Sequence, residues 1–215
     1  MNLLHIDSSI LGSYSVSRQL TSALAQTLQE TFPAAVYQYR DLAIESPGHL
    51  TPAMMAGMSD PGQADEVSQA QLALSKTLQQ EFLDADVVVV GAPMYNFSVP
   101  SQLKTWIDRI AQAGVTFKYT DQGAVGLAGG KTIIIVSSRG GNYVGTAYEL
   151  AMDHQEAFLK TVFGFFGIED IRIIRAEGTN LGGSSKENAL NAALQQVGSV
   201  AADLLQTASR QEATA

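Results

Sequence analysis

Four consecutive valines, Val87 to Val90, constrain the fold of this chain more than any other segment. An unbroken β-branched run is typical of a strand that is covered on both faces, as in a parallel sheet between two layers of helices. Further apolar or alternating runs also predict strands. These runs lie at Asn2–Asp7, Ala35–Arg40, Lys131–Val136 and Ile171–Ala176. The chain is therefore expected to form a sheet of five strands.

Helical patterns lie between the predicted strands. Apolar residues recur at every fourth position from Val16 to Leu28, which marks one face of a helix that ends before Pro33. Other segments predict helices at Ala64–Phe82, Ser101–Ala113, Tyr148–Phe163 and Lys186–Leu205. Because helices separate the strands, the connections should be right-handed crossovers. The predicted fold class is α/β, a doubly wound five-stranded parallel sheet with helices on both faces.

Three segments fall outside this alternation. Glu45–Gly62 is rich in Pro, Gly and Met and is expected to form a long loop. Phe117–Gly126 is expected to form a small hairpin around Asp121-Gln122-Gly123. We expect a single domain over residues 1–205, followed by a frayed tail over residues 206–215.

The charge and the cysteine content narrow the class of function. The net charge is −8 and the isoelectric point is about 4.8, which disfavours binding to nucleic acid or to an anionic membrane surface. The chain has no cysteine, which excludes disulfides, thiolate nucleophiles and cysteine-ligated metals. Because the sequence shows neither a basic leader nor a long apolar segment, we expect a cytoplasmic protein.

The histidines do not predict a metal site, because their spacing matches no ligand motif. His5 lies in the first predicted strand and is expected to be a core residue. His49 lies in the long loop, and His154 lies in a predicted helix, where a surface or interface position is expected. The GxSxG motif is absent, so no side chain is assigned as a catalytic nucleophile.

A serine-rich loop follows the first strand. The serines between the strand and the next helix are Ser8, Ser9, Ser13, Ser15 and Ser17. Free backbone N–H groups at a helix N-terminus, together with hydroxyl donors, can bind a phosphate without any lysine. The alternative is that Ser15 is simply the N-cap of the helix. The loop lacks both the Gly-Lys-Ser/Thr of a P-loop and the GxGxxG of a dinucleotide site.

Two more loops follow the third and fourth predicted strands. Pro93–Pro100 contains two aromatic residues, a methionine and an asparagine, and Ser137–Tyr143 contains Arg139 and the pair Gly140-Gly141. Apolar side chains and close backbone approach both suit a flat ring. In a doubly wound sheet the ligand binds beyond the carboxyl ends of the strands, where the strand order reverses. The three loops together therefore predict a mononucleotide site.

The same segments carry a resemblance to a known family. They read SSILGSYSVSRQL at residues 8–20, APMYNFSVPSQLKTWID at 92–108, AGVTFKYT at 113–120, SSRGG at 137–141 and FFGI at 165–168. In these motifs the chain resembles the FMN-dependent NADH:azo-compound oxidoreductases, also described as NADH:quinone reductases, within the wider flavodoxin-like group. The resemblance runs from Leu4 to about Gly178. It implies a flavodoxin-like fold and a homodimer whose active sites lie between the two subunits.

The resemblance also implies roles for single residues. The phosphate and ribityl chain of FMN would contact Ser9, Ser15, Val16 and Ser17. The isoalloxazine ring would contact Pro93, Met94, Tyr95, Asn96 and Phe97 on one side and Ser138, Arg139, Gly140 and Gly141 on the other. Tyr119 and Phe163 would contribute to the substrate face. Val16 stands where some members carry Gln, and its backbone N–H can serve the same purpose.

The implied activity is the reduction of quinones and azo compounds with electrons from NADH or NADPH. Because flavin carries the chemistry, hydride would pass through flavin N5 in a ping-pong cycle and the protein would bind and orient the reactants. Two other classes stay open at this point, a flavodoxin-type electron carrier and a nucleotide-binding regulatory module without turnover. The sequence leaves open the preferred donor, the substrate in the cell and the source of protons.

Overall fold

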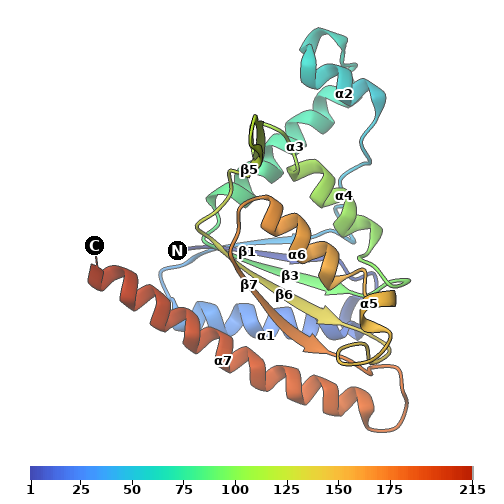
Figure 1. Cartoon of the computed structure of the whole chain (residues 1–215), viewed down its shortest axis with the longest axis vertical. Helices are drawn as coiled ribbons and strands as arrows, with labels where there is room; N and C mark the ends of the chain where they lie inside the picture. The colour runs from blue at the N-terminus through green and yellow to red at the C-terminus, as the bar shows by residue number, and fades with distance from the viewer. Residues whose placement is uncertain (215) are drawn as a thin grey trace.

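The computed structural model describes the backbone of residues 1–214 and the side chains of residues 1–208. Its main sheet is parallel, with the strand order β2-β1-β3-β6-β7 (Figure 1). The strands are β1 Asn2–Asp7, β2 Val36–Asp41, β3 Val87–Pro93, β6 Thr132–Ser138 and β7 Asp170–Ala176. The order reverses between β1 and β3, which confirms the predicted doubly wound sheet.

Helices cover both faces of the sheet. The helices α1 (Val16–Thr31) and α7 (Ser185–Thr214) lie on one face (Figure 1). The opposite face is covered by α3 (Glu66–Asp84), α4 (Ser101–Ile110) and α6 (Glu156–Phe165). Every residue of the central strand β3 is buried, as the valine run predicts for a strand enclosed on both sides. Among the described residues, no helix is long and apolar enough to span a membrane.

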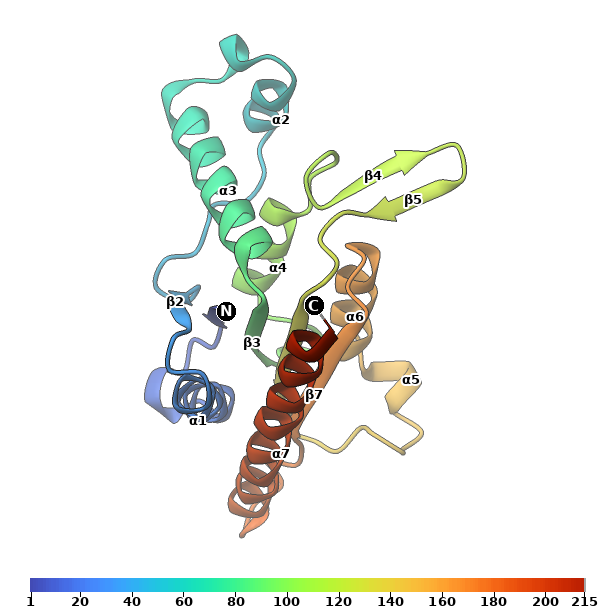
Figure 2. The ribbon, with the colours of Figure 1, turned by 90° about the vertical axis from the view of Figure 1, so that its left-hand side faces the viewer.

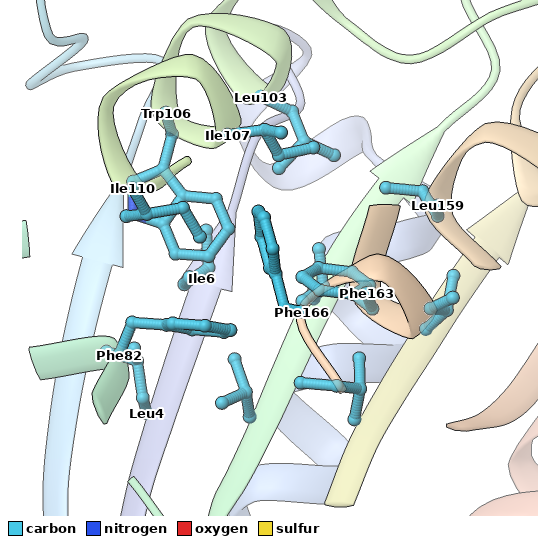
Figure 3. Packing of buried hydrophobic residues seen from close by; sticks show 14 of the residues in the cluster. Leu4, Ile6, Phe82, Leu103, Trp106, Ile107, Ile110, Leu159, Phe163 and Phe166 are labelled. Carbon is cyan, nitrogen blue, oxygen red and sulfur yellow. The ribbon is translucent and has the colours of Figure 1, made fainter. Parts of the chain in front are cut away.

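The core beneath α3, α4 and α6 is aromatic, and it corrects one of the expected site residues. Phe82 contacts Trp106 edge to face at 5.8 Å between ring centroids and stacks on Phe163 at 6.2 Å (Figure 3). Phe163 has no exposed surface, so its expected place on the substrate face is wrong. The helical periodicity of α6 directs Phe163 toward the sheet and Phe165 toward the hairpin. The ring centroid of Phe165 lies 4.7 Å from that of Phe117 in the hairpin.

The segment predicted as a long loop contains the helix α2 (Pro52–Ser59), followed by a short 3₁₀ turn at Pro61–Gln63. Thr51 caps α2, since its hydroxyl accepts a hydrogen bond from the backbone N–H of Met54 at 3.2 Å. Pro52 stands in the first turn, where its missing N–H costs no helical hydrogen bond. Proline here starts a helix rather than excluding one, which is why the loop prediction is wrong over these residues.

The predicted helix Tyr148–Phe163 is two helices, α5 (Glu149–Met152) and α6. The carboxylate of Asp153 accepts hydrogen bonds from the backbone N–H groups of Gln155 and Glu156, both at 3.1 Å, and so starts α6 anew. His154 is exposed at this junction rather than inside a helix. At the end of the chain, α7 continues through residues 206–214, where the sequence predicts a frayed tail.

The predicted hairpin is present. It consists of β4 (Phe117–Thr120) and β5 (Gly123–Gly126), which pair in antiparallel fashion and project from the body of the molecule (Figure 2). The hairpin joins the end of α4 to the start of β6. It therefore lies toward the amino ends of the strands, away from the loops that follow β1, β3 and β6.

Candidate functional site

The loops after β1, β3 and β6 are joined by hydrogen bonds at the carboxyl edge of the sheet. The hydroxyl of Ser8 donates to the carbonyl of Gly91 at 2.6 Å, and those of Ser9 and Tyr95 lie 3.2 Å apart. The backbone N–H of Met94 donates to the carbonyl of Ser138 at 2.8 Å. The structure therefore brings together the three loops that the sequence predicts to share a site, at the point where the strand order reverses.

The serine loop leaves donors free at the start of α1. Ser15 is the N-cap, because its hydroxyl accepts from the backbone N–H of Arg18 at 3.3 Å, and it lies 3.0 Å from the hydroxyl of Ser17. The backbone N–H groups of Val16 and Ser17 have no acceptor among the described residues. Capping is therefore real but incomplete, and two amides at the positive end of a 16-residue helix remain for a ligand.

The chemistry of this donor set suits a phosphate. Residues 8–17 contain no carboxylate, and the hydroxyls of Ser8, Ser9, Ser15 and Ser17 are buried around the helix start. The turn Gly12–Tyr14 is exposed, with Gly12 at a φ of +52°. Neutral donors and a helix N-terminus, with no carboxylate in the loop itself, are the features expected of an anion site.

Arg18 holds the serine loop from behind and was missed by sequence reasoning. Its Nε and Nη2 donate to the carbonyl of Ser9 at 3.1 and 2.8 Å, and its Nη1 donates to Asp41 at 2.6 Å. Hydrogen bonding to Asp41 raises the pKa of the guanidinium above its ordinary value. The arginine is thus fixed as a cation behind the loop.

Asp7 anchors the end of β1 next to this arginine. Its carboxylate accepts from the hydroxyls of Thr21 at 2.8 Å and Tyr39 at 3.1 Å. Burial by itself would raise the pKa of Asp7, but the hydrogen bonds and charges of its neighbours, His5 first among them, lower it overall. His5 is buried, with its Nδ1 2.8 Å from the hydroxyl of Tyr37, which confirms the predicted core histidine.

The loop after β3 forms a tight two-residue hairpin turn. Tyr95 and Ser98 exchange two backbone hydrogen bonds, at 2.9 and 3.1 Å, around Asn96 and Phe97. Both central residues have positive φ, +49° for Asn96 and +70° for Phe97. Asparagine tolerates this region, whereas phenylalanine adopts it only under strain. Both side chains are exposed, and their backbone N–H groups have no acceptor among the described residues.

The loop after β6 is fixed by backbone pairing with the segment after β7. The N–H of Arg139 donates to Ala176 at 2.9 Å, and the carbonyls of Gly140 and Gly141 accept from Asn180 and Gly178, both at 3.0 Å. Ser138 and Pro93 are buried at the paired ends of β6 and β3. These hydrogen bonds therefore fix the position of the Gly140-Gly141 backbone relative to the carboxyl edge of the sheet.

The side chain of Arg139 is buried rather than exposed to solvent. Its guanidinium lies within ion-pair distance of three carboxylates, Asp153 at 2.9 Å, Glu156 at 2.6 Å and Glu177 at 3.2 Å. Any contact of Arg139 with a ring at this edge would have to come from its backbone. None of these acidic partners was picked out from the sequence, although Asp153 and Glu156 have the spacing of a helix cap.

Tyr119 is not brought to these loops within one chain. It belongs to the hairpin β4–β5, which projects from the body of the molecule (Figure 2). Its side chain is 74% exposed, and its ring centroid lies 5.5 Å from that of Phe117. A cavity of about 410 Å³ lies beside the Tyr95–Ser98 turn, where Lys104 and Phe158 also line it. A larger cavity, of about 880 Å³, lies at the opposite edge beside Met1 and Lys131. Size alone does not mark the site, because the larger cavity is far from the three loops.

Within the described residues, no group of three or more His, Asp or Glu side chains is arranged so that it could hold a metal ion.

Known proteins share this architecture. The sequence model of a family described as having a flavodoxin-like fold matches residues 1–200. An FMN-dependent NADH:quinone oxidoreductase of Polaromonas naphthalenivorans (strain CJ2) is 55% identical over 197 residues, which cover 91% of this chain and 91% of that protein. One of the same name from Rhizobium meliloti (strain 1021) is 55% identical over 190 residues, 88% of this chain and 92% of that protein.

A solved structure agrees over nearly the whole chain. It is the FMN complex of an FMN-dependent NADH-azoreductase from Bacillus anthracis str. Ames Ancestor. The TM-score is 0.86 at 26% identity, with 95% of this chain and 100% of that chain covered.

Proposed function

This chain belongs to the flavodoxin-like family, among the FMN-dependent NADH:quinone oxidoreductases, and we propose that it reduces quinones and azo compounds with electrons from NADH through bound FMN. The observation that carries the proposal is the meeting of three loops at the strand reversal. One loop offers free amides at a helix N-terminus. The second presents a turn whose central N–H groups have no acceptor among the described residues, and the third presents a half-buried glycine pair.

When bound, FMN would supply the redox chemistry, a two-electron hydride transfer through N5 between NADH or NADPH and the substrate in a ping-pong cycle. The chain binds and orients it. The N–H groups of Val16 and Ser17 and the hydroxyls of Ser9, Ser15 and Ser17 would hold the phosphate. The Tyr95–Ser98 turn and Gly140-Gly141 would lie along the ring. The free N–H groups of Asn96 and Phe97 are donors for the polar edge of the ring.

The proposal includes a homodimer with active sites at the subunit interface. Large apolar side chains are exposed on the loops at the carboxyl edge, which is unfavourable in water unless a partner covers them. These include Ile10, Leu11, Tyr14, Phe97, Val144, Tyr148, Leu150 and Leu181. Tyr119 lies on the hairpin β4–β5, toward the amino ends of the strands, and we propose that a second subunit contacts it there. Light scattering should give the mass of two chains; the mass of one chain would contradict the dimer.

Steady-state kinetics test the proposed activity. Protein loaded with FMN should oxidise NADH when a soluble quinone is the only acceptor, with no protein partner present. NADPH in place of NADH, and an azo dye in place of the quinone, then define the donor and acceptor preferences. Bound FMN without turnover would instead support an electron carrier or a regulatory module. A cytoplasmic location stays a prediction of the sequence.

A further inference from the structure

We propose that Arg139 is a positioning residue, whose buried guanidinium couples the two loops at the ring end of the site, Tyr95–Ser98 and Ser138–Tyr143. The inference rests on the proposed function, because it assigns the ion cluster around Arg139 a role in holding the flavin ring. Arg139 would act through the backbone of these loops rather than by touching the ring with its side chain.

The guanidinium is enclosed by charges from two parts of the chain, the junction of α5 and α6 and the segment after β7. Arg139 has no exposed side-chain surface, and its Nη2 lies 2.9 Å from Asp153 and 2.6 Å from Glu156. Its Nη1 lies 3.2 Å from Glu177, which follows β7. Its Nε donates to the side-chain carbonyl of Gln155 at 3.0 Å. Nη2 has no partner in hydrogen-bond geometry among the described residues, so its two carboxylates contribute charge. The hydrogen bonds of Nε and Nη1 orient the guanidinium.

One branch of the cluster reaches the far end of the loop after β6. The same Glu177 oxygen that pairs with Arg139 accepts hydrogen bonds from the backbone N–H groups of Tyr143 at 3.0 Å and Val144 at 3.3 Å. Arg139 opens this loop and Tyr143 closes it. The cluster therefore fixes both ends of the segment that contains Gly140-Gly141.

The other branch reaches the turn after β3. Asp153 uses one carboxylate oxygen for Arg139 and the other to cap α6. The next residue, His154, donates its backbone N–H to the carbonyl of Phe97 at 3.0 Å. Phe97 has a φ of +70°, a conformation that persists only where its surroundings impose it. Gln155 adds a hydrogen bond from its side-chain amide to the carbonyl of Ala92, at the end of β3.

The charges of the cluster nearly balance, and Arg139 is needed for that balance. Besides the three carboxylates it contains Arg175, which pairs with Glu156 at 2.7 Å. The ring of Tyr143 lies 5.7 Å from the Arg139 guanidinium, and Glu149 accepts from the N–H of Gly145 at the rim. Without Arg139, one arginine would face three carboxylates, and the excess negative charge would favour protonation as the pH falls.

Fluorescence titrations with FMN and with riboflavin, between pH 6 and pH 8, test the proposal on the full chain. Riboflavin lacks the phosphate and so reports on the ring end alone. In Arg139→Met the dissociation constants of both ligands should rise about tenfold at pH 8, as for one misplaced hydrogen bond. Relative to the wild type, the loss should shrink at pH 6, because protonation relieves the excess negative charge. Arg139→Lys keeps the charge, so it should recover part of the affinity. Its loss of affinity relative to the wild type should be the same at pH 6 and pH 8.

The matched control is Arg172→Met, at the amino end of β7, where Arg172 pairs with Asp170 at 2.8 Å. It should leave both affinities unchanged. If Arg139→Met fails to fold, Asp153→Asn retains a capping side chain and should give a smaller loss of the same kind. Unchanged binding of both flavins by a folded variant, or a loss confined to FMN, would overturn the inference alone. Failure of the wild type to bind FMN would overturn the proposed function and the inference with it.

Discussion

The two ends of the candidate site are built on opposite principles. At the phosphate end, the groups that face the ligand are neutral, hydroxyls and amides at the start of α1, with Arg18 held behind them. At the ring end, the surface proposed to face the ligand is mostly backbone, and a cluster of two arginines and three carboxylates, centred on the buried Arg139, lies behind it. We therefore expect ligand recognition at the first end to depend on the donors themselves, and at the second end on the residues that hold the loops in place.

The largest expected effect is at the ring end. Glu156→Gln removes a buried carboxylate that pairs with both Arg139 and Arg175. Breaking a buried ion pair on one side leaves uncompensated charge, so the free energy of unfolding should fall by about 3 kcal/mol. Urea unfolding measures this loss.

A surface ion pair provides the control for this change. Asp108→Asn removes the partner of Lys104, which lies at 2.6 Å on the exposed face of α4. It should cost at most about 1 kcal/mol. If Glu156→Gln and Asp108→Asn lowered the free energy of unfolding equally, the ion cluster at the ring end would contribute no more to stability than a surface ion pair.

The second prediction concerns the phosphate end. Ser15→Ala combined with Ser17→Ala should raise the dissociation constant of FMN by about 100-fold, through two lost hydrogen bonds to a charged group. Stability should fall by only about 1 kcal/mol, the usual cost of losing an N-cap. Ser13→Ala, in the exposed turn of the same loop, is the control and should change neither quantity. A double variant that loses stability and retains FMN would leave capping as the whole role of these serines.

The third prediction compares the ends by acid titration. The pKa values of Asp7 at the phosphate end and Glu156 at the ring end both lie below their ordinary values, because hydrogen bonds and cationic neighbours outweigh burial. Stability from a lowered pKa is fully present above the unfolded pKa, near 4, and is lost as the pH falls through the folded value.

Urea unfolding at several pH values would measure that loss. The free energy of unfolding should be level from pH 7 to about pH 5 and then fall, by about 1.4 kcal/mol for each unit of pKa difference. Asp7→Asn should be less stable at pH 7 and show a shallower decline. A decline in the variant as steep as in the wild type would place the acid sensitivity elsewhere.

The smallest expected effect is on the hairpin. Tyr119→Ala removes an exposed ring and should change stability by less than about 0.5 kcal/mol, with FMN affinity unchanged. If a second subunit receives this ring at the substrate face, kcat/KM for a quinone should fall roughly threefold to tenfold, the worth of one aromatic contact. Tyr119→Phe, which keeps the ring, should restore the rate. Unchanged kcat/KM in Tyr119→Ala would show that this side chain does not contribute to the substrate face.

The fold could be predicted because its signals are local. Four valines in a row require a strand enclosed on both faces, and the serines between β1 and α1 indicate free donors at a helix start. The ends of two helices were also predictable in principle. Thr51-Pro52 is a start signal for α2, and Asp153 with Glu156 is a start signal for α6.

The parts that could not be predicted depend on distant residues. Arg139 meets Asp153 and Glu156 from the junction of α5 and α6, and Glu177 from beyond β7, 38 residues along the chain. No spacing rule connects these positions before the sheet brings them together. Phe163 was misplaced for a related reason, since its direction depends on where α6 begins and on how that helix packs on Phe82 (Figure 3).

The central claim, an FMN site at the carboxyl edge of the sheet, is tested most directly by reconstitution. The purified chain is mixed with excess FMN, passed through a desalting column and examined for the visible absorbance of bound flavin. We predict a yellow protein that retains one FMN per chain. A colourless protein, with no spectral change on adding FMN and no NADH oxidation, would contradict the account.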